Sequence, residues 1–464
     1  MNETRVLADH LSSTRFDDLP AVVVETAKLC VLDILGVGIV AGRRPWSEMA
    51  MAVVVDSGGE PRSTVWGRGV RTTPQQAALL NGTAAHGIEM DDRRPSVRVH
   101  PGSVAVPAAL AVTESVNANG QELIAAVVSG YELGLRVGHA VRLRAGIHSA
   151  GHTGVWTSVG AAGRGLGLSP GEMCNAMGIA GSMAAGLAEF TQDSVGTMVK
   201  RLHGGMSAHN GVMAARLAGE GFTGPGSVLE GVNGYCRTYA QSPDHIRLDQ
   251  LVDGLGTDFF ICKREVKPYA AWGGSHTSIE AVGTLMSDHG ISADDVERIV
   301  IGAARYLIDE HEDAKPRSLM AAQYSLPFVT AIAAVRGPLA LVDPDEIWTE
   351  DVLDDDAILA MASRVGFYVD AELDDIYLNR GHYGDARVTI TTKSGAEYTK
   401  LVNDSKGTSK NPMTSVEIEA KFRRLCSRVL PEQRTQQIID MVSHLDELPD
   451  VRILGDLVAG PEAR

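Results

Sequence analysis

Apolar side chains in the first half of the chain recur every three to four residues. In the run ELIAAVVSGYELGLRVGHAVRL, one face of a helix collects Leu123, Val127, Val128, Tyr131 and Leu135. Similar Ala-rich runs, separated by Gly-containing breaks, continue from about Asp9 to Gly231. The pattern predicts an all-α domain, and it assigns this helical face to a hydrophobic core rather than to a cofactor site.

The pattern changes after about Phe260. VERIVIGAA is a β-branched run, and ARVTITTKSGAEYTKLV alternates around a Ser394-Gly395 turn as a hairpin does. KNPMTSVEIEAKFRRL then returns to helix, with Thr414 and Glu417 spaced as a capping box, and RTQQIIDMVSHL continues it. We therefore predict a mostly α protein, with a large helical domain built from residues 1–262 and 404–464 and a smaller α+β domain over 263–403.

Length and composition limit the function further. A chain of 464 residues exceeds what one hydrophobic core usually supports, which agrees with two domains. The formal charge of −16 argues against nucleic acid or an anionic membrane as partner. We expect a cytoplasmic protein, because neither a leader-like start nor a long uncharged apolar run is present. Five widely spaced cysteines indicate neither a disulfide framework nor an iron-sulfur cluster.

One segment, HGIEMDDRRPSVRVHPGS, concentrates titratable groups within a dozen residues. Its acids, arginines and histidine are Glu89, Asp91, Asp92, Arg93, Arg94, Arg98 and His100. Arginine fixes carboxylates by bidentate hydrogen bonds, and an acid beside a histidine tunes it for proton transfer near neutral pH. A charged surface turn whose aspartates cap the next helix fits this segment equally well, so other segments must decide.

A second segment, RAGIHSAGHTGVWTS, holds His148 and His152 four residues apart. That spacing also occurs among metal ligands, but such histidines usually share one continuous helix. Here Gly151 and Gly154 interrupt the helix, and no H-E-x-x-H pattern occurs in the chain. The sequence therefore favours a site without a metal ion.

Two further segments carry cationic groups. MVKRLHGGMSAHNGV offers Lys200, Arg201 and His203 before a Gly pair, and CKREVKPYAAWGGSH offers Lys263, Arg264, Lys267 and His276 at the predicted domain junction. A domain junction is a common place for a cleft. Each segment alone is equally compatible with a solvated basic turn. Together, in an otherwise acidic chain, they favour a site that attracts a small molecule with several carboxylates.

The order of these segments resembles that of the MmgE/PrpD family, which includes 2-methylcitrate dehydratases, cis-aconitate decarboxylases and an iminodisuccinate epimerase. The likeness runs nearly end to end, through HGIEMDDRRPSVRVHPGS, GIHSAGHTG, VKRLHGG, VKPYAAWGGSH, ARYLIDEH and AAQYSLPF. The resemblance implies a homodimer, with a helical domain from both chain ends, a lid domain between them, and neither metal nor organic cofactor.

The resemblance also implies site residues. Its active-site histidines fall on His100 and His148, its lysines on Lys200 and Lys267, its tyrosine on Tyr306, and its acids on Glu89, Asp91 and Asp92. We predict that substrate binding also uses Arg93, Arg94, His203 and His276. The chain departs from the family pattern at Glu89, where Asp is usual, at Arg93, where Thr is usual, by one extra residue before His100, and at Trp272, where smaller residues are common.

The predicted chemistry is proton transfer at a carbon beside a carboxylate of a small polycarboxylate. Lys200 and Lys267 would stabilise the developing charge, His100 would move the proton with Asp91 or Asp92 orienting it, and His148 and Tyr306 would serve the opposite face or a leaving group. Dehydration of a 2-methylcitrate-like acid is the first expectation, because it is the most frequent activity in the family. The alternatives are epimerisation of a substituted dicarboxylate, decarboxylation of a cis-aconitate-type acid, a non-catalytic polycarboxylate-binding dimer, and a metal-dependent hydrolase.

Overall fold

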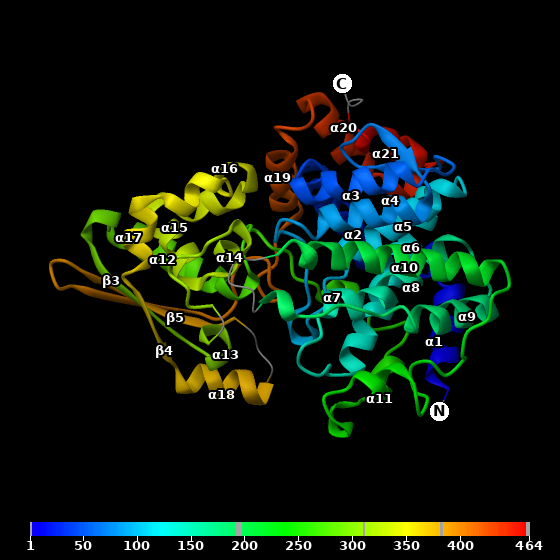
Figure 1. Ribbon diagram of the computed structural model, residues 1–464, viewed down its shortest axis with the longest axis horizontal. Coiled ribbons are helices and arrows are strands. Elements are labelled where there is room, and N and C mark those ends of the chain that lie inside the picture. The colour runs from blue at the N-terminus through cyan, green and yellow to red at the C-terminus, as the bar shows by residue number, and fades with distance from the viewer. Residues whose placement is uncertain (1, 192–196, 310, 381–383, 461–464) are drawn as a thin grey trace.

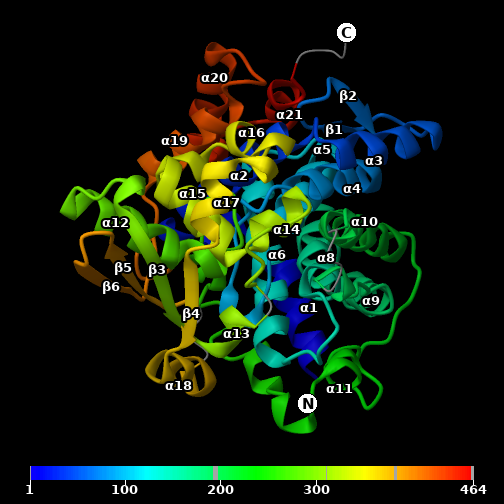
Figure 2. The same ribbon diagram turned by 60° about the vertical axis from the view of Figure 1, so that its left-hand side comes forward.

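The computed structural model describes residues 2–191, 197–309, 311–380 and 384–460. Two bodies lie side by side (Figure 1), a large helical one and a smaller one that contains a sheet. The large body takes both ends of the chain, and the last helices pack beside the first ones (Figure 2). The predicted fold class, mostly α with a smaller α+β part, is confirmed.

The large body is built from long helices in the first half of the chain and three helices at its end. The N-terminal set comprises α1 (Glu3–Ser13), α2 (Ala21–Ala41), α3 (Pro45–Asp56), α4 (Pro74–Ala85), α5 (Gly102–Ser115), α6 (Gly120–Ala140), α7 (Ser149–His152), α8 (Gly154–Gly165), α9 (Pro170–Gly181), α10 (Val199–Gly219) and α11 (Tyr235–Tyr239). The C-terminal set comprises α19 (Ser415–Cys426), α20 (Glu432–Ser443) and α21 (Arg452–Val458).

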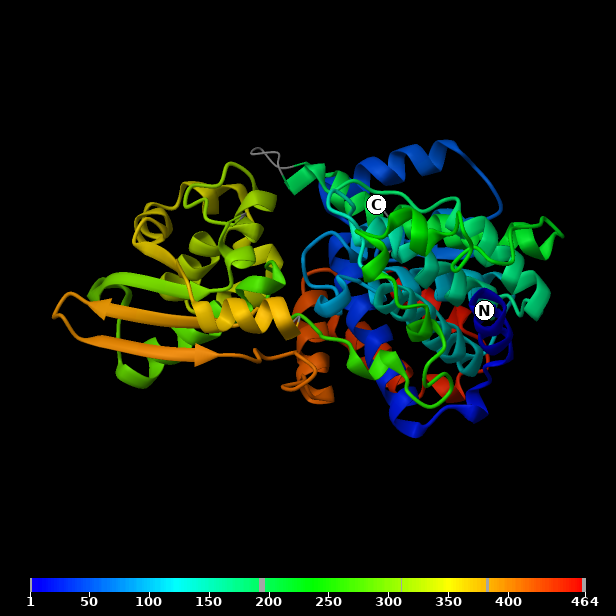
Figure 3. The same ribbon diagram turned by 90° about the horizontal axis from the view of Figure 1, so that it is seen from below.

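The smaller body alternates helices and strands. Its helices are α12 (His276–His289), α13 (Arg305–Ile308), α14 (Leu319–Tyr324), α15 (Leu326–Arg336), α16 (Pro344–Ile347), α17 (Asp356–Ala362) and α18 (Ala371–Arg380). Its strands are β3 (Val296–Ala303), β4 (Val365–Val369), β5 (Ala386–Thr392) and β6 (Glu397–Val402), in the spatial order β4-β3-β5-β6. Figure 3 shows the β5–β6 hairpin extending away from the helical body.

Several local predictions are confirmed. The apolar face of α6, from Leu123 to Leu135, is fully buried in the core of the helical body. The alternating run folds as the β5–β6 hairpin, with Ser394-Gly395 in its turn. Thr414 and Glu417 form a reciprocal capping box at the start of α19, where the Glu417 carboxylate accepts from the Thr414 amide at 2.7 Å.

Two strand pairings were not predicted. The first half is not wholly helical, since β1 (Ser63–Val65) and β2 (Val70–Thr72) form an antiparallel hairpin. Three-residue strands are too short for alternation to be visible in a sequence. In the sheet, β4 pairs in parallel with β3, a partnership that depends on the crossover between them and leaves no local pattern.

Two hydrophobic cores meet near the predicted site. One core draws on residues 7–266 and 418–458, and the other on residues 270–390 together with a few side chains from α2, α4, α19 and the segment after α4. Among the helices that the structure describes, none is both long enough and apolar enough to cross a membrane.

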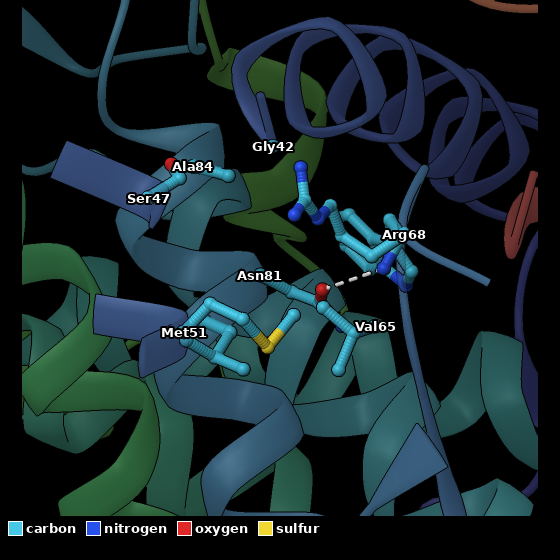
Figure 4. A pocket seen from close by; sticks show the side chains of 9 residues that line it. Gly42, Ser47, Met51, Val65, Arg68, Asn81 and Ala84 are labelled. Atoms are coloured by element: carbon cyan, nitrogen blue, oxygen red, sulfur yellow. Dashed lines mark hydrogen bonds between the residues drawn. The ribbon is translucent and has the colours of Figure 1, made fainter. Parts of the chain in front are cut away.

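A small cavity lies between α3 and α4 (Figure 4). Its lining includes Met51, Val65, Arg68 and Asn81, and the Asn81 amide oxygen accepts from the Trp66 backbone N–H at 3.0 Å. Its volume of about 10 Å³ approaches what a single water requires. A polycarboxylate does not fit there, so this cavity is separate from the chemistry described below.

Candidate active site

The acidic segment predicted as a site links α4 to α5 through residues 86–101. Three of its backbone carbonyls accept hydrogen bonds from buried side chains of distant helices. Arg201 of α10 donates to Gly87 at 2.9 Å, Gln323 of α14 donates to Ile88 at 3.3 Å, and Lys421 of α19 donates to Met90 at 2.8 Å. The segment is therefore a fixed element shared by both bodies. Its acids are buried, so the surface location of the surface-turn alternative is wrong, while the expected bond from an aspartate to the start of the next helix is made by Asp92.

Glu89 lies at the centre of this segment, in the left-handed region with a φ of 57°. Its carboxylate is buried and pairs with both predicted lysines: it contacts Lys200 directly and lies 3.1 Å from the Lys267 ammonium. The Tyr324 hydroxyl donates to it at 3.3 Å. Burial lowers the pKa of Lys200, while its attraction to Glu89 opposes that change. The two lysines meet here as predicted, and a protein carboxylate joins them.

Asp91 binds two imidazoles through one oxygen. Its Oδ2 lies 2.7 Å from His86 Nδ1 and 3.1 Å from His100 Nδ1, and its Oδ1 lies 3.5 Å from the Lys267 ammonium. Because an ionised carboxylate only accepts, the hydrogen-bonded His86 carries its proton on Nδ1 and leaves Nε2 with a free lone pair. The His100 contact lacks hydrogen-bond geometry, but the negative charge of Asp91 favours a proton on the facing Nδ1 of that ring too. Asp91 stays ionised, since His100, His86 and Lys267 hold its pKa well below the ordinary value despite burial.

The two imidazoles differ in access. The His86 side chain is completely buried, and burial lowers its pKa to about 3. The His100 side chain is 19% exposed, and burial lowers its pKa too, although Asp91 opposes that effect. Both rings are therefore neutral near pH 7, and His100 is the one that a small molecule can reach.

Asp92 faces away from this cluster. Its carboxylate accepts from the Gly102 amide at 2.7 Å and from the Tyr131 hydroxyl at 2.6 Å. Burial raises its pKa to about 7. Of the two acids that the sequence left open as partners of His100, the structure places Asp91 in contact with that ring and uses Asp92 to anchor the start of α5.

His148 and His203 form a second imidazole pair. Their Nδ1 atoms lie 2.8 Å apart, and the Phe190 ring packs edge-on against both. The His148 ring centre is 5.8 Å from that of His86, which connects this pair to the Asp91 cluster. Burial lowers the pKa of His203 to about 4 and that of His148 well below its ordinary value. Both rings are neutral near pH 7.

The predicted arginines bind the segment to its neighbour along the junction. The Arg93 and Glu265 backbones pair through two hydrogen bonds of 2.8 Å, and the Arg93 guanidinium lies 3.4 Å from the Glu265 carboxylate. Arg94 donates to the Lys263 carbonyl at 2.8 Å. His276 begins α12, where its Nε2 lies 3.2 Å from the Ala271 carbonyl. These three residues stay predicted substrate contacts.

Two tyrosines compete for the predicted tyrosine role. Tyr306 stacks on Tyr377 with ring centres 5.4 Å apart, and the Arg98 guanidinium lies over the Tyr306 ring, 5.0 Å from its centre. Tyr324 instead reaches the centre of the site, since its hydroxyl donates to Glu89 and its ring lies 5.8 Å from the Lys200 ammonium. The Trp272 ring centre is 6.4 Å from that of Tyr324, so this family departure lies on the same wall.

The cluster of His86, Asp91 and His100 also contains metal-binding residue types, with ligand atoms within 4.8 Å of one another. Ligands about 2.0–2.1 Å from a tetrahedral zinc ion lie roughly 3.3 Å apart. Asp91 is closer than that to both rings: it is hydrogen-bonded to His86 at 2.7 Å and lies 3.1 Å from His100. The histidines that the sequence offered as metal ligands, His148 and His152, point to different partners. His148 bonds to His203, while the His152 ring packs edge-on against Tyr239.

Some residues of the candidate site escaped the sequence analysis. His86 opens the acidic segment, five residues before Asp91, but its role depends on a turn after α4 that brings it back to that acid. Tyr324 lies in the AAQYSLPF segment, and only the packing of α14 directs it to Glu89. Lys421 lies on an amphipathic helix where a lysine normally faces solvent. Only 2% of its side chain is exposed, and nothing in the neighbouring sequence indicates that burial.

Comparison with known proteins finds matches over most of the chain. The MmgE/PrpD N-terminal domain matches residues 5–246, and the MmgE/PrpD C-terminal domain matches residues 269–447. The cis-aconitate decarboxylase-like protein oryM of Aspergillus oryzae is 29% identical, over 99% of this chain and 98% of that protein. Cis-aconitate decarboxylases of Aspergillus terreus and Homo sapiens are 28% and 25% identical, over 97% and 99% of this chain and 94% and 95% of theirs.

These relatives and the matched domains indicate a lyase-type enzyme. The two matched domains account for most of the chain, and the residues that carry the resemblance, from the acidic segment to the lysine of the junction, gather at one buried site. The chain belongs to the MmgE/PrpD family.

Proposed function

We propose that this enzyme decarboxylates a small unsaturated tricarboxylate of the cis-aconitate type. The proposal rests on one observation: the Glu89 carboxylate pairs with both Lys200 and Lys267, and the neutral, accessible His100 belongs to the same cluster. Three relatives that align over nearly the whole chain bear the name of that activity, or a name derived from it, which supports this reaction over the others in the family.

Decarboxylation breaks one carbon–carbon bond, releases CO2 and leaves an electron pair on the conjugated carbon skeleton. A remaining carboxylate shares that charge, and buried ammonium groups stabilise it more strongly than water does. We assign this role to Lys200 and Lys267. A proton must then be added at carbon, and we assign its delivery to His148, whose Nε2 carries a proton whenever its Nδ1 accepts from His203.

Dehydration of a 2-methylcitrate-like hydroxy acid is the second candidate. This reaction needs a base as well as an acid, and the site offers both. His100 has its Nδ1 3.1 Å from the Asp91 carboxylate, which favours a proton there, and its Nε2 lone pair can then take a proton beside a substrate carboxylate. His148 would then protonate the departing hydroxyl. Arg93, Arg94 and His276 are proposed to bind the remaining carboxylates, and Tyr306 stays a proposed contact on the far side.

Proton NMR in deuterium oxide separates these reactions. The enzyme would be incubated with cis-aconitate, 2-methylcitrate, citrate and iminodisuccinate in turn. Decarboxylation gives a product with one fewer carboxylate and one deuterium at carbon, while dehydration gives an alkene and epimerisation gives exchange at an unchanged skeleton. Binding without any conversion, detected as a raised melting temperature, would contradict the enzymatic proposal and favour a binding protein. The homodimer also stays a prediction, which sedimentation equilibrium measures.

A further inference from the structure

The His148–His203 contact joins two rings through the same type of atom. A hydrogen bond between two Nδ1 atoms 2.8 Å apart needs one proton, because two Nδ1–H groups repel and two bare Nδ1 atoms have no donor. Both rings are neutral near pH 7, since burial lowers both pKa values. The pair therefore holds one proton on Nδ1 of one ring and one proton on Nε2 of the other.

This constraint makes the outer nitrogen of each ring depend on its partner. If His203 donates, His148 has a bare Nδ1 and carries its proton on Nε2, where it can act as an acid. If His148 donates, its Nε2 is bare and can act as a base. Asp91 allows no such choice at His86, because its carboxylate accepts from Nδ1 and fixes that ring as the Nδ1–H tautomer.

The surroundings of the pair connect it to both the site and the surface. The rings of His148 and His86 lie 5.8 Å apart, and Lys200 is close enough to influence the pKa of both His148 and His203. His203 lies on α10, where its neighbours Leu202 and Met206 are exposed, and it is itself only half-buried. Phe190 covers the pair from one side.

We propose that His203 is a positioning residue that sets the tautomer of His148 and replaces the proton that His148 gives to the substrate. In this step His148 donates its Nε2 proton, its Nδ1 takes the proton of His203 Nδ1, and His203 takes a proton from water at Nε2. One proton enters and one leaves, and no charged imidazole accumulates. After product release, water protonates His148 Nε2, the Nδ1 proton of His148 returns to His203 Nδ1, and water accepts the proton of His203 Nε2, which restores the starting tautomers.

This inference rests on the proposed function for its catalytic consequence, but the tautomer pairing needs no substrate. Long-range proton–nitrogen NMR on enzyme labelled with 15N-histidine reports which nitrogen of each neutral ring is protonated. Assignment uses His203→Ala and His148→Ala. We expect one of the two rings to be an Nδ1–H tautomer and the other an Nε2–H tautomer. Two rings of the same tautomer would overturn the proposal.

The kinetic test uses His203→Ala, His203→Asn and a matched control. Asn places an amide where Nδ1 lies, so it keeps a hydrogen bond to His148 but cannot pass a proton onward. With cis-aconitate, both variants are expected to lose about 10- to 100-fold in kcat with KM changed less than about threefold. Added imidazole should restore His203→Ala, which has room for it, and leave His203→Asn unchanged. His209→Ala, another half-buried histidine on α10, should match the wild type.

The outcomes separate the two proposals. Wild-type kcat in His203→Asn, or no rescue of His203→Ala by imidazole, would overturn the relay. If none of the acids is converted by the wild type, the proposed function fails, and the tautomer measurement alone decides whether the pairing exists. A melting temperature of each variant near that of the wild type confirms that lost turnover is not lost folding.

Discussion

Lys421 and Met90 are separated by 331 residues in the sequence, yet the Lys421 ammonium donates to the Met90 carbonyl at 2.8 Å. Met90 lies between Glu89 and Asp91, two acids of the candidate active site. The same ammonium lies 2.6 Å from the buried Asp33 carboxylate of α2. Helix α19 lies between the two bodies (Figure 1), so a C-terminal lysine holds the acidic segment in place from the domain junction.

Replacing Lys421 with Met should destabilise the fold and disturb the site together. The change leaves Asp33 buried without its ammonium partner, which costs about 3 kcal/mol or more. Chemical denaturation measures that loss. The double variant Asp33→Asn with Lys421→Met removes the orphan charge and should recover part of the stability, but not kcat, because the Met90 carbonyl still lacks its donor. Equal recovery of both quantities would contradict a positioning role for Lys421.

His100→Ala should reduce kcat by about 100- to 10,000-fold with a smaller change in KM, if the reaction removes a proton from carbon. For decarboxylation, which consumes a proton, the loss should be smaller than that of His148→Ala. Turnover of 2-methylcitrate and cis-aconitate by both variants therefore tests the assigned roles. His289→Ala, at an exposed histidine that stacks on Tyr398, is the control and should leave both rates unchanged.

Glu89→Gln should move the alkaline limit of activity to lower pH. Burial already lowers the pKa of Lys200, and the Glu89 carboxylate raises it, so removal of that charge lowers the pKa further. Lys200 then loses its proton, and its stabilisation of substrate charge, at a lower pH. The pH dependence of kcat/KM measures the shift. Exposed Glu297→Gln provides the control, and an unchanged alkaline limit in Glu89→Gln would contradict the assignment of Lys200.

Glu114→Gln should remove a pH dependence of folding stability. Burial raises the pKa of Glu114 to about 7 in the folded protein, above its ordinary value of 4.5. An acid with a raised folded pKa stabilises the fold below its unfolded pKa, and this contribution is lost as pH rises through about 7. Urea denaturation at pH 5 and pH 7.5 should therefore show a smaller fall in stability for the variant than for the wild type.

Exposed Glu397→Gln should retain the wild-type difference between the two pH values. If Glu114→Gln loses as much stability as the wild type between pH 5 and pH 7.5, the carboxyl does not titrate in this range. The Thr64 backbone and hydroxyl, which donate to Glu114 at 2.8 and 2.6 Å, would then keep it ionised throughout.

Exhaustive chelation should leave turnover unchanged. Asp91 lies 2.7 Å from His86 and 3.1 Å from His100, both closer than the roughly 3.3 Å between the ligands of a tetrahedral zinc ion, and its contact with His86 is a hydrogen bond. Activity is measured before and after treatment with a chelator, with the metal content checked by elemental analysis. Loss of activity that returns with one divalent ion would contradict this prediction and revive the metal-dependent alternative.

The sequence by itself determined the elements and the chemistry that each segment carries. Helix α6 and the β5–β6 hairpin were predictable from the spacing of their apolar residues, because repeats of 3.6 and 2 residues are recognisable within a dozen residues. The acidic segment, the two lysines and His100 were identifiable because such residue types are rare together in a globular chain. The ordered segments also sufficed to identify the family, and dehydration as the first reaction was an expectation from that resemblance alone.

Only the tertiary structure decided how these groups meet. Asp91 rather than Asp92 binds His100, His86 shares the same oxygen, and Tyr324 rather than Tyr306 reaches Glu89. The pairing of His148 with His203 and the reach of Lys421 across the chain likewise appear only in three dimensions. Local sequence fixes backbone periodicity, whereas the contacts of a side chain depend on turns and helix packing that bring together residues from 5 to more than 300 positions apart.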